Sequence, residues 1–216
     1  MKKVILQNLF FLIPYLFFLL ISGYFLVLYP KGEIHLFINQ FHNNFYNYFF
    51  YYATFLGEGF AIATIVLSLC FFCYRFALLV AVSSIFSSLI VQILKHTVYA
   101  DVVRPKKFFE GIHELNFVPL VENYLYNSFP SGHTTVAFAT FFCLSMILKN
   151  KFLKFLMFVI ALTIGFSRVY LSQHFLNDIY AGSIIGITIA LFVYYFFFLS
   201  KKLKNKKWIE KSLLNN

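Results

Sequence analysis

Six stretches of this chain are apolar over a length that matches the thickness of a lipid bilayer. The hydrocarbon core of a bilayer is about 30 Å thick, and a helix needs roughly 20 apolar residues to cross it. Because lipid offers no hydrogen-bond partner to backbone N–H and C=O groups, a crossing segment folds as a helix that satisfies those groups internally. The sequence therefore predicts an all-α, polytopic integral membrane protein, with a six-transmembrane-helix bundle over residues 8–28, 56–74, 76–94, 133–148, 152–170 and 178–199.

Composition excludes the main classes of soluble protein. Only 12% of the residues are charged, whereas a soluble domain carries about 25%. The 32 Phe and 15 Tyr residues are too many for the core of a soluble protein of this size. An ordinary cytosolic domain, a disordered chain and a nucleic-acid-binding protein are therefore excluded, although the formal net charge is +10. The length of 216 residues suits one domain, so residues 1–216 are expected to form a single membrane unit.

Two local patterns are interpreted as structural. Cys70, Cys73 and Cys143 are too few for a disulfide framework, and the C-x-x-C pair lies in an apolar run, which favours buried thiols. The first apolar stretch follows two lysines, as the apolar part of a signal peptide does. Its end at Tyr24 and Phe25 lacks the small residues of a cleavage site, so the stretch is interpreted as a retained anchor.

The distribution of positive charge predicts the orientation in the membrane. Six spans place both termini on one side, and cytoplasmic loops carry an excess of Lys and Arg. With both termini in the cytoplasm, 12 of the 18 basic residues fall on the cytoplasmic side. The lysine-rich tail at 201–211 is interpreted as an ordinary positive-inside anchor with an interfacial tryptophan, Trp208. The other basic residues and all six histidines then lie on the outer side.

Two outer segments are not predicted to cross the membrane. In residues 36–55, aromatic side chains recur at helical spacing, which suits an interfacial helix; a loop with aromatic anchors is the alternative. Residues 96–130 contain Pro105, Gly111 and Pro119 and are interpreted as a structured aqueous loop on the outer face. We expect these two segments to select the headgroup of a bound lipid.

Ionisable side chains gather at the outer ends of the predicted spans, where they are functional candidates. Taken singly, Lys95 and Arg168 are explained as snorkelling anchors, and His133 or His174 as a hydrogen-bonded histidine. Together, three cations on the outer face run against the positive-inside trend and need an anionic partner, which a bound phosphate supplies. The group comprises Lys95, Arg104, Ser131, Gly132, His133, Arg168, His174 and Asp178.

The spacing within this group adds chemistry. His174 and Asp178 are four residues apart, so on a helix the carboxylate accepts from one imidazole nitrogen and leaves the other free as a nucleophile or base. Ser131 and Gly132 at a helix N-terminus present backbone N–H groups to an anion. Two glycines farther along the last span are expected to let a neighbouring helix approach closely. These glycines are Gly182 and Gly186.

The group resembles the three signature motifs of the type 2 phosphatidic acid phosphatase superfamily, whose membrane branch contains bacterial lipid phosphate and undecaprenyl pyrophosphate phosphatases. The second and third motifs match without gaps. The first departs, because eight residues separate Lys95 from Arg104 where six are usual, and Thr97 stands at the usual lysine position. The resemblance covers residues 95–178, and its six-span pattern covers the chain. The motifs read Lys95…Arg104-Pro105, Pro130-Ser131-Gly132-His133 and Ser167-Arg168-(five residues)-His174-(three residues)-Asp178.

The resemblance implies a metal-free mechanism that needs no cofactor. His174 is expected to attack phosphorus and form a phosphohistidine, while Asp178 orients its ring. His133 is expected to protonate the leaving oxygen and then to activate water for the second step. Positive side chains and the start of a helix are expected to hold the phosphate oxygens. These expected phosphate ligands are Lys95, Arg104, Ser131, Gly132 and Arg168.

The implied function is hydrolysis of the phosphate monoester or diphosphate of a membrane lipid, such as undecaprenyl pyrophosphate or a glycerophospholipid phosphate. The reaction is expected at the outer face of a bacterial inner membrane. A lipid A phosphatase or a lipid phosphotransferase would share every motif, and a non-enzymatic carrier of anionic lipid is a further alternative. The expected partners are the lipid and the bilayer, and the sequence does not specify an oligomeric state. The remaining histidines are interpreted as ordinary loop and interface residues; they are His35, His42, His96 and His113.

Overall fold

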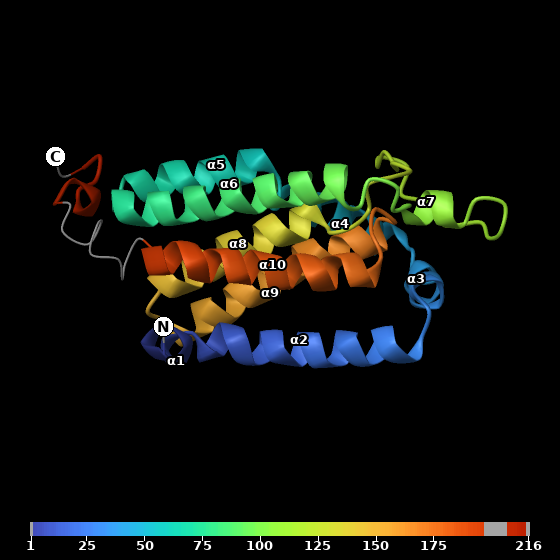
Figure 1. Cartoon of the computed structure of the whole chain (residues 1–216), viewed down its shortest axis with the longest axis horizontal. Coiled ribbons are helices and arrows are strands. Elements are labelled where there is room, and N and C mark those ends of the chain that lie inside the picture. The colour runs from blue at the N-terminus through green and yellow to red at the C-terminus, as the bar shows by residue number, and fades with distance from the viewer. Residues whose placement is uncertain (1, 197–206, 215–216) are drawn as a thin grey trace.

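The computed structural model describes residues 2–196 and 207–214, and the regular structure within these residues is entirely helical (Figure 1). Long helices run side by side along one axis, so the predicted all-α class is confirmed. The helices are α1 (Lys2–Gln7), α2 (Leu9–Leu28), α3 (Lys31–Asn39), α4 (Asn44–Phe55), α5 (Gly59–Cys70), α6 (Tyr74–Thr97), α7 (Pro105–Phe108), α8 (Gly132–Ile147), α9 (Lys151–Tyr170), α10 (Leu176–Tyr194) and the 3₁₀ helix η2 (Lys207–Glu210).

The central helix of the bundle is α8, which packs against α6, α9 and α10. Most residues of α8 are small or aromatic, and its buried residues lie on every side of the helix, which is typical of a helix in the centre of a bundle. Its Phe138 and Phe142 are fully buried, and Phe142 meets Phe11 of α2 with 5.0 Å between ring centroids. On the outside of this core, α2 packs on α9 and α10, and α5 packs on α6. Three neighbouring helices therefore fix the position of the N-terminus of α8.

Gly182 and Gly186 bring α10 close to α8, as the sequence predicts. A Cβ at Gly182 would lie 2.9 Å from the carbonyl oxygen of Ser131, and a Cβ at Gly186 would collide with the carbonyl oxygen of Thr135. A larger residue at either position would therefore have to displace the backbone of α8. The two glycines therefore set the separation between α8, which begins next to His133, and α10, which begins after the turn that follows α9.

The predicted spans at 8–28, 76–94, 152–170 and 178–199 correspond to α2, α6, α9 and α10, although α10 ends at Tyr194 and residues 197–199 lie outside the described residues. Among the described residues, these four helices are long and apolar enough to cross a membrane. The predicted span at 56–74 differs, because α5 is short and meets α4 at a bend of 53°. The break coincides with Gly57-Glu58-Gly59, where two glycines disfavour a continuous helix. Counted as one unit, the bent pair gives a fifth candidate span. At 16 residues α8 is shorter, so the number six stays a prediction.

The segment 36–55 forms parts of two helices, α3 and α4, where the sequence predicted one interfacial helix. Residues 40–43 separate them, and the Asn43 side chain caps α4 by accepting a hydrogen bond from the Tyr46 N–H. One side of α4 packs against α9. Exposed aromatic residues lie elsewhere on the helix, and its place in a membrane interface stays a prediction. These residues are Phe45, Tyr48, Phe49 and Tyr52.

The two labelled ends of the chain lie at one end of the bundle, while α3 and α7 lie at the other (Figure 1). The predicted outer loop at 96–130 is mostly irregular after α6 ends, and α7 is its short helix. Residues 201–206 of the lysine-rich tail lie outside the described residues. Farther on, Glu210 pairs with Arg75 at the start of α6, with 2.5 Å between Oε1 and Nη1.

The three thiols are free, and none takes part in a disulfide. Cys143 is buried within α8 and Cys73 is buried at the start of α6, which agrees with the prediction of buried thiols. Cys70, at the end of α5, is only half-buried.

Candidate active site

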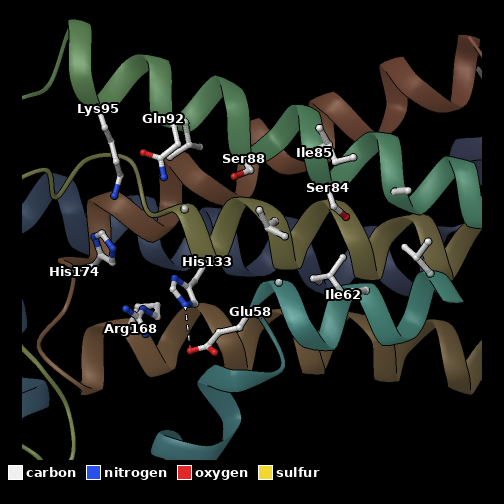
Figure 2. A pocket seen from close by; sticks show the side chains of 18 of the residues that line it. Glu58, Ile62, Ser84, Ile85, Ser88, Gln92, Lys95, His133, Arg168 and His174 are labelled. Carbon is white, nitrogen blue, oxygen red and sulfur yellow. Dashed lines mark ion pairs between the residues drawn. The ribbon is translucent and has the colours of Figure 1, made fainter. Parts of the chain in front are cut away.

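A cavity of about 800 Å³ extends from the predicted site residues along α5, α6 and α8 (Figure 2). Ser131 and Asp178 are fully buried and do not line it. The fold thus brings all three predicted motifs to one place, although they come from α6, α8, α9, α10 and two connecting segments. The predicted site residues that line the cavity are Lys95, Arg104, Gly132, His133, Arg168 and His174.

Asp178 orients the His174 ring through a hydrogen bond to its Nδ1. His174 lies in the turn between α9 and α10, and its Nδ1 is 3.2 Å from Asp178 Oδ2. The same carboxylate oxygen accepts hydrogen bonds from the Ser128 hydroxyl at 2.5 Å and from the Phe175 N–H at 3.0 Å. Three donors therefore fix the carboxylate, and the carboxylate fixes the tautomer and orientation of the imidazole.

The charge state of His174 is set by its surroundings. Its side chain is 2% exposed, and this burial is the main reason that the pKa of His174 lies well below its usual range. Three cations near the ring lower the pKa further; they are Arg104, Lys95 and Arg168. The imidazole is therefore neutral at physiological pH. Because Nδ1 is directed at the carboxylate, the lone pair of Nε2 is available to a group bound in the cavity.

Lys95 reaches the cavity despite the unusual spacing of its motif. It lies in the last turn of α6, is buried, and points into the cavity (Figure 2). Thr97, at the usual lysine position, is exposed and donates its hydroxyl to the Ile93 carbonyl oxygen at 2.7 Å. The loop between α6 and Arg104 therefore accommodates the two additional residues.

Gln173 joins the two arginines of the site. Its Oε1 accepts hydrogen bonds from Arg104 Nη1 at 3.2 Å and from Arg168 Nη2 at 3.5 Å. Its amide nitrogen donates to the Glu122 carbonyl oxygen at 2.9 Å and to Asn123 Oδ1 at 2.6 Å. Sequence reasoning missed Gln173, because one glutamine between motif residues is not distinctive. Its position directly before the predicted nucleophile is the available signal.

The arginines keep part of their charge uncompensated. Arg168 donates from Nη1 to Thr54 Oγ1 at 2.7 Å, and Arg104 donates from Nε to the Tyr126 carbonyl oxygen at 2.8 Å. Arg168 Nε has no hydrogen-bond partner in the described part of the chain. Within residues 2–196 and 207–214, no carboxylate forms an ion pair with either guanidinium. The pair therefore suits an anion with several oxygens, such as phosphate.

The start of α8 forms the remaining wall. Ser131 caps this helix, because its hydroxyl accepts from the Thr134 N–H at 3.5 Å and from the Thr134 hydroxyl at 2.9 Å. Its hydroxyl is thus used in the cap, while Gly132 and His133 line the cavity. His133 Nε2 is 4.0 Å from Oε1 of Glu58, which lies at the break between α4 and α5 (Figure 2). The sequence-based site did not include Glu58.

A second polar cluster supports the turn that carries His174. His35 of α3 is 1% exposed, and its Nε2 lies 3.1 Å from Ser172 Oγ. His42 donates from Nε2 to the Tyr170 carbonyl oxygen at 2.9 Å and stacks on the Tyr170 ring. Ser172 has a φ of 54°, a left-handed conformation that a non-glycine residue adopts only with support from its surroundings. His42, in the loop between α3 and α4, agrees with its interpretation as a loop residue, whereas His35 is buried within α3, which corrects its interpretation as an ordinary loop or interface residue.

Comparison with known proteins identifies the family. A family model described as the PAP2 superfamily matches residues 76–202. The chain belongs to the PAP2 superfamily. It is 36% identical over 80 residues to the bacitracin transport permease protein BcrC of Bacillus licheniformis. The aligned residues cover 37% of this PAP2 chain and 38% of BcrC. The chain spans between 28% and 38% of the length of the first curated relatives that it matches.

Two solved structures extend the similarity over more of the PAP2 chain. The structure of Aquifex aeolicus LpxE has a TM-score of 0.66 and 25% identity, and covers 74% of this chain and 92% of LpxE. The structure of the first transmembrane PAP2 type phosphatidylglycerolphosphate phosphatase from Bacillus subtilis has a TM-score of 0.62 and 26% identity. The match covers 90% of this chain and 96% of the Bacillus subtilis chain. Together with the long apolar helices, these similarities establish a multi-pass PAP2 membrane protein.

Proposed function

We propose that this PAP2 protein is an integral membrane phosphatase that releases phosphate from a membrane lipid without a metal ion. The observation that carries the proposal is the pairing of His174 with Asp178 at the wall of a cavity that also holds three cations. A neutral, oriented imidazole is a nucleophile. Fixed cations supply the charge stabilisation on which phosphoryl transfer depends.

The reaction proceeds in two steps through a phosphohistidine. In the first step, the bond from His174 Nε2 to phosphorus forms as the phosphorus–oxygen bond to the lipid breaks, and His133 gives its proton to the leaving oxygen. In the second step, water attacks phosphorus, His133 takes a proton from that water, and the phosphorus–nitrogen bond breaks. Gly132 contributes a backbone N–H at the start of α8, while Ser131 holds this start in place through its cap. The cations that hold the phosphoryl oxygens are Lys95, Arg104 and Arg168.

The shape of the cavity supports a lipid as the substrate. From the cations it continues between α5 and α6, where Ile62, Val66 and Ile85 are among the lining residues. Along α6 the lining runs from Lys95 to Ala81, which is about 21 Å at about 1.5 Å per residue. A hydrocarbon chain fits such an apolar passage, while the phosphate remains at its polar end.

The proposed substrates are undecaprenyl pyrophosphate and glycerophospholipid phosphates. The similarity to a phosphatidylglycerolphosphate phosphatase supports the second class. We place the site at the outer face of a bacterial inner membrane, with six spans made of the four long helices, α5 and α8, and with α4 in the outer interface. The excess of basic residues at the opposite end of the bundle supports cytoplasmic termini. Impermeant thiol reagents should then label His113→Cys, but not Lys149→Cys, in intact cells.

The test is phosphate release by the purified protein in lipid nanodiscs, measured with undecaprenyl pyrophosphate, phosphatidic acid, phosphatidylglycerol phosphate and lipid A. We expect release from at least one lipid, retention of activity in EDTA, and inhibition by vanadate, which mimics the phosphoryl transition state. His174→Ala should abolish release without loss of folding. Normal turnover by that variant would exclude the nucleophile. An EDTA loss reversed by a divalent ion would exclude the metal-free mechanism, and failure on every lipid would favour a carrier.

A further inference from the structure

A carboxylate at the break between α4 and α5 faces the proposed general acid. Glu58 is the N-cap residue of α5, but its side chain makes no capping hydrogen bond. Instead it lines the cavity, and its Oε1 lies 4.0 Å from His133 Nε2 (Figure 2). The two side chains come from segments that are far apart in sequence, and Glu58 lies at the bend of 53° between α4 and α5.

The charges around His133 explain why such a carboxylate matters. The general acid must carry a proton when the leaving oxygen departs. The three cations of the cavity and the His174 ring face the same space, and the cations disfavour a fourth positive charge on His133. Asp178 is occupied with His174, Ser128 and the Phe175 N–H on the far side of the wall. Among the described residues that line the cavity, Glu58 is the acidic one.

We propose that Glu58 is a positioning residue that stabilises the protonated form of His133 and orients its ring toward the leaving oxygen. This assignment rests on the proposed phosphatase function. The proton that reaches the leaving oxygen still comes from His133, and Glu58 exchanges no atom with the substrate. The arrangement parallels the other imidazole of the site, where Asp178 occupies one ring nitrogen of His174 and leaves the other for phosphorus.

A purely structural role would have a different signature. An acidic residue at the start of a helix interacts favourably with the helix dipole, and its loss lowers stability by a small amount for any substrate. A residue that supports proton donation matters only when the leaving group needs a proton. The Glu58 side chain is 43% exposed, so solvent screening limits its contribution to the range of about 1 kcal/mol, or about fivefold in rate.

The experiment compares Glu58→Gln with the wild-type protein on a lipid phosphate, whose alkoxide leaving group needs protonation, and on p-nitrophenyl phosphate, whose leaving group does not. We expect kcat/KM on the lipid phosphate to fall about fivefold near neutral pH, with the alkaline limb of its pH profile moved to lower pH. On p-nitrophenyl phosphate the change should be less than about twofold. Glu58→Asp should recover part of the lost rate, and Glu33→Gln, which neutralises an exposed acid in the first turn of α3 outside this cavity, should behave as wild type.

Equal losses on both substrates, or an unchanged pH profile, would overturn the assignment of Glu58 while leaving the phosphatase function intact. A wild-type protein that hydrolyses neither substrate would overturn the proposed function and this assignment with it.

Discussion

Replacing Gln173 by glutamate should weaken phosphate binding strongly while the bundle stays folded. Glutamate has nearly the same size, so its carboxylate would lie between Arg104 and Arg168, where the amide oxygen is 3.2 Å and 3.5 Å from the two guanidinium nitrogens. At an effective dielectric constant of about 20, each contact between unit charges about 4 Å apart contributes about 4 kcal/mol. Burying the carboxylate costs several kcal/mol, which includes the loss of the two hydrogen bonds that the Gln173 amide nitrogen donates to the Glu122 carbonyl oxygen and to Asn123 Oδ1. The net stabilisation of the free site is therefore about 3 kcal/mol.

A substrate phosphate would have to overcome this internal ion pair. At about 1.4 kcal/mol per tenfold change, KM for a lipid phosphate should rise about 100-fold, with a much smaller change in kcat. The inhibition constant of vanadate should rise by a similar factor, which provides a readout that does not depend on the lipid. Gln92→Glu is the matched control, because Gln92 lines the same cavity but, within the described part of the chain, forms no hydrogen bond with either arginine. A KM within threefold of wild type, or equal effects of the two substitutions, would refute the role of Gln173 in holding the arginines.

Three further outcomes are expected. Lys95→Ala should lower kcat/KM by about 10- to 100-fold through loss of a charge-assisted contact to phosphate. Thr97→Ala should change kcat/KM by less than about twofold. A larger loss with Thr97→Ala than with Lys95→Ala would contradict the assignment of Lys95 as the phosphate ligand. Gly186→Ala should destabilise the protein by about 3 kcal/mol, because its Cβ collides with the backbone of α8, whereas Gly59→Ala, with open space around its Cβ, should leave the thermal unfolding midpoint nearly unchanged. Burial lowers the pKa of His35 from 6.5 to about 4. The unfolded chain therefore binds more protons at His35 between these values, so the stability that this residue contributes above pH 6.5 should decline by about 3 kcal/mol as pH falls toward 4. Thermal unfolding of His35→Gln should show a decline that is smaller by about this amount.

Much of the site was predictable because charged groups are rare in so apolar a chain. In a membrane protein, an ionisable residue at the end of a span has few uses, so Arg104, Arg168 and His174 stand out even without a structure. Periodicity and length likewise predict the four long helices, since nearly every residue in them must be apolar. Lys95 marks the limit of this reasoning, because spacing alone does not reveal how a loop accommodates two additional residues.

The residues that sequence reasoning missed act through contacts between distant segments. Gln173 depends on the backbone of Glu122, and Ser128 reaches the carboxylate of Asp178 across 50 positions in the chain. A lone glutamine or serine carries no periodic or charge signal, so neither differs in sequence from a surface residue. The angle at the α4–α5 break is likewise a tertiary property: glycines allow a bend, but packing on α9 and α6 sets its direction.

Residues on both sides of the break between α4 and α5 contact side chains of the candidate active site. On one side of the bend, Thr54 accepts a hydrogen bond from Arg168. On the other side, Glu58 faces His133. A change in the angle between the two half-helices, such as an arriving lipid chain would require, shifts both contacts at once. In the proposed phosphatase, the bend at Gly57-Glu58-Gly59 would therefore couple the entry of a lipid chain to the alignment of the groups around phosphorus.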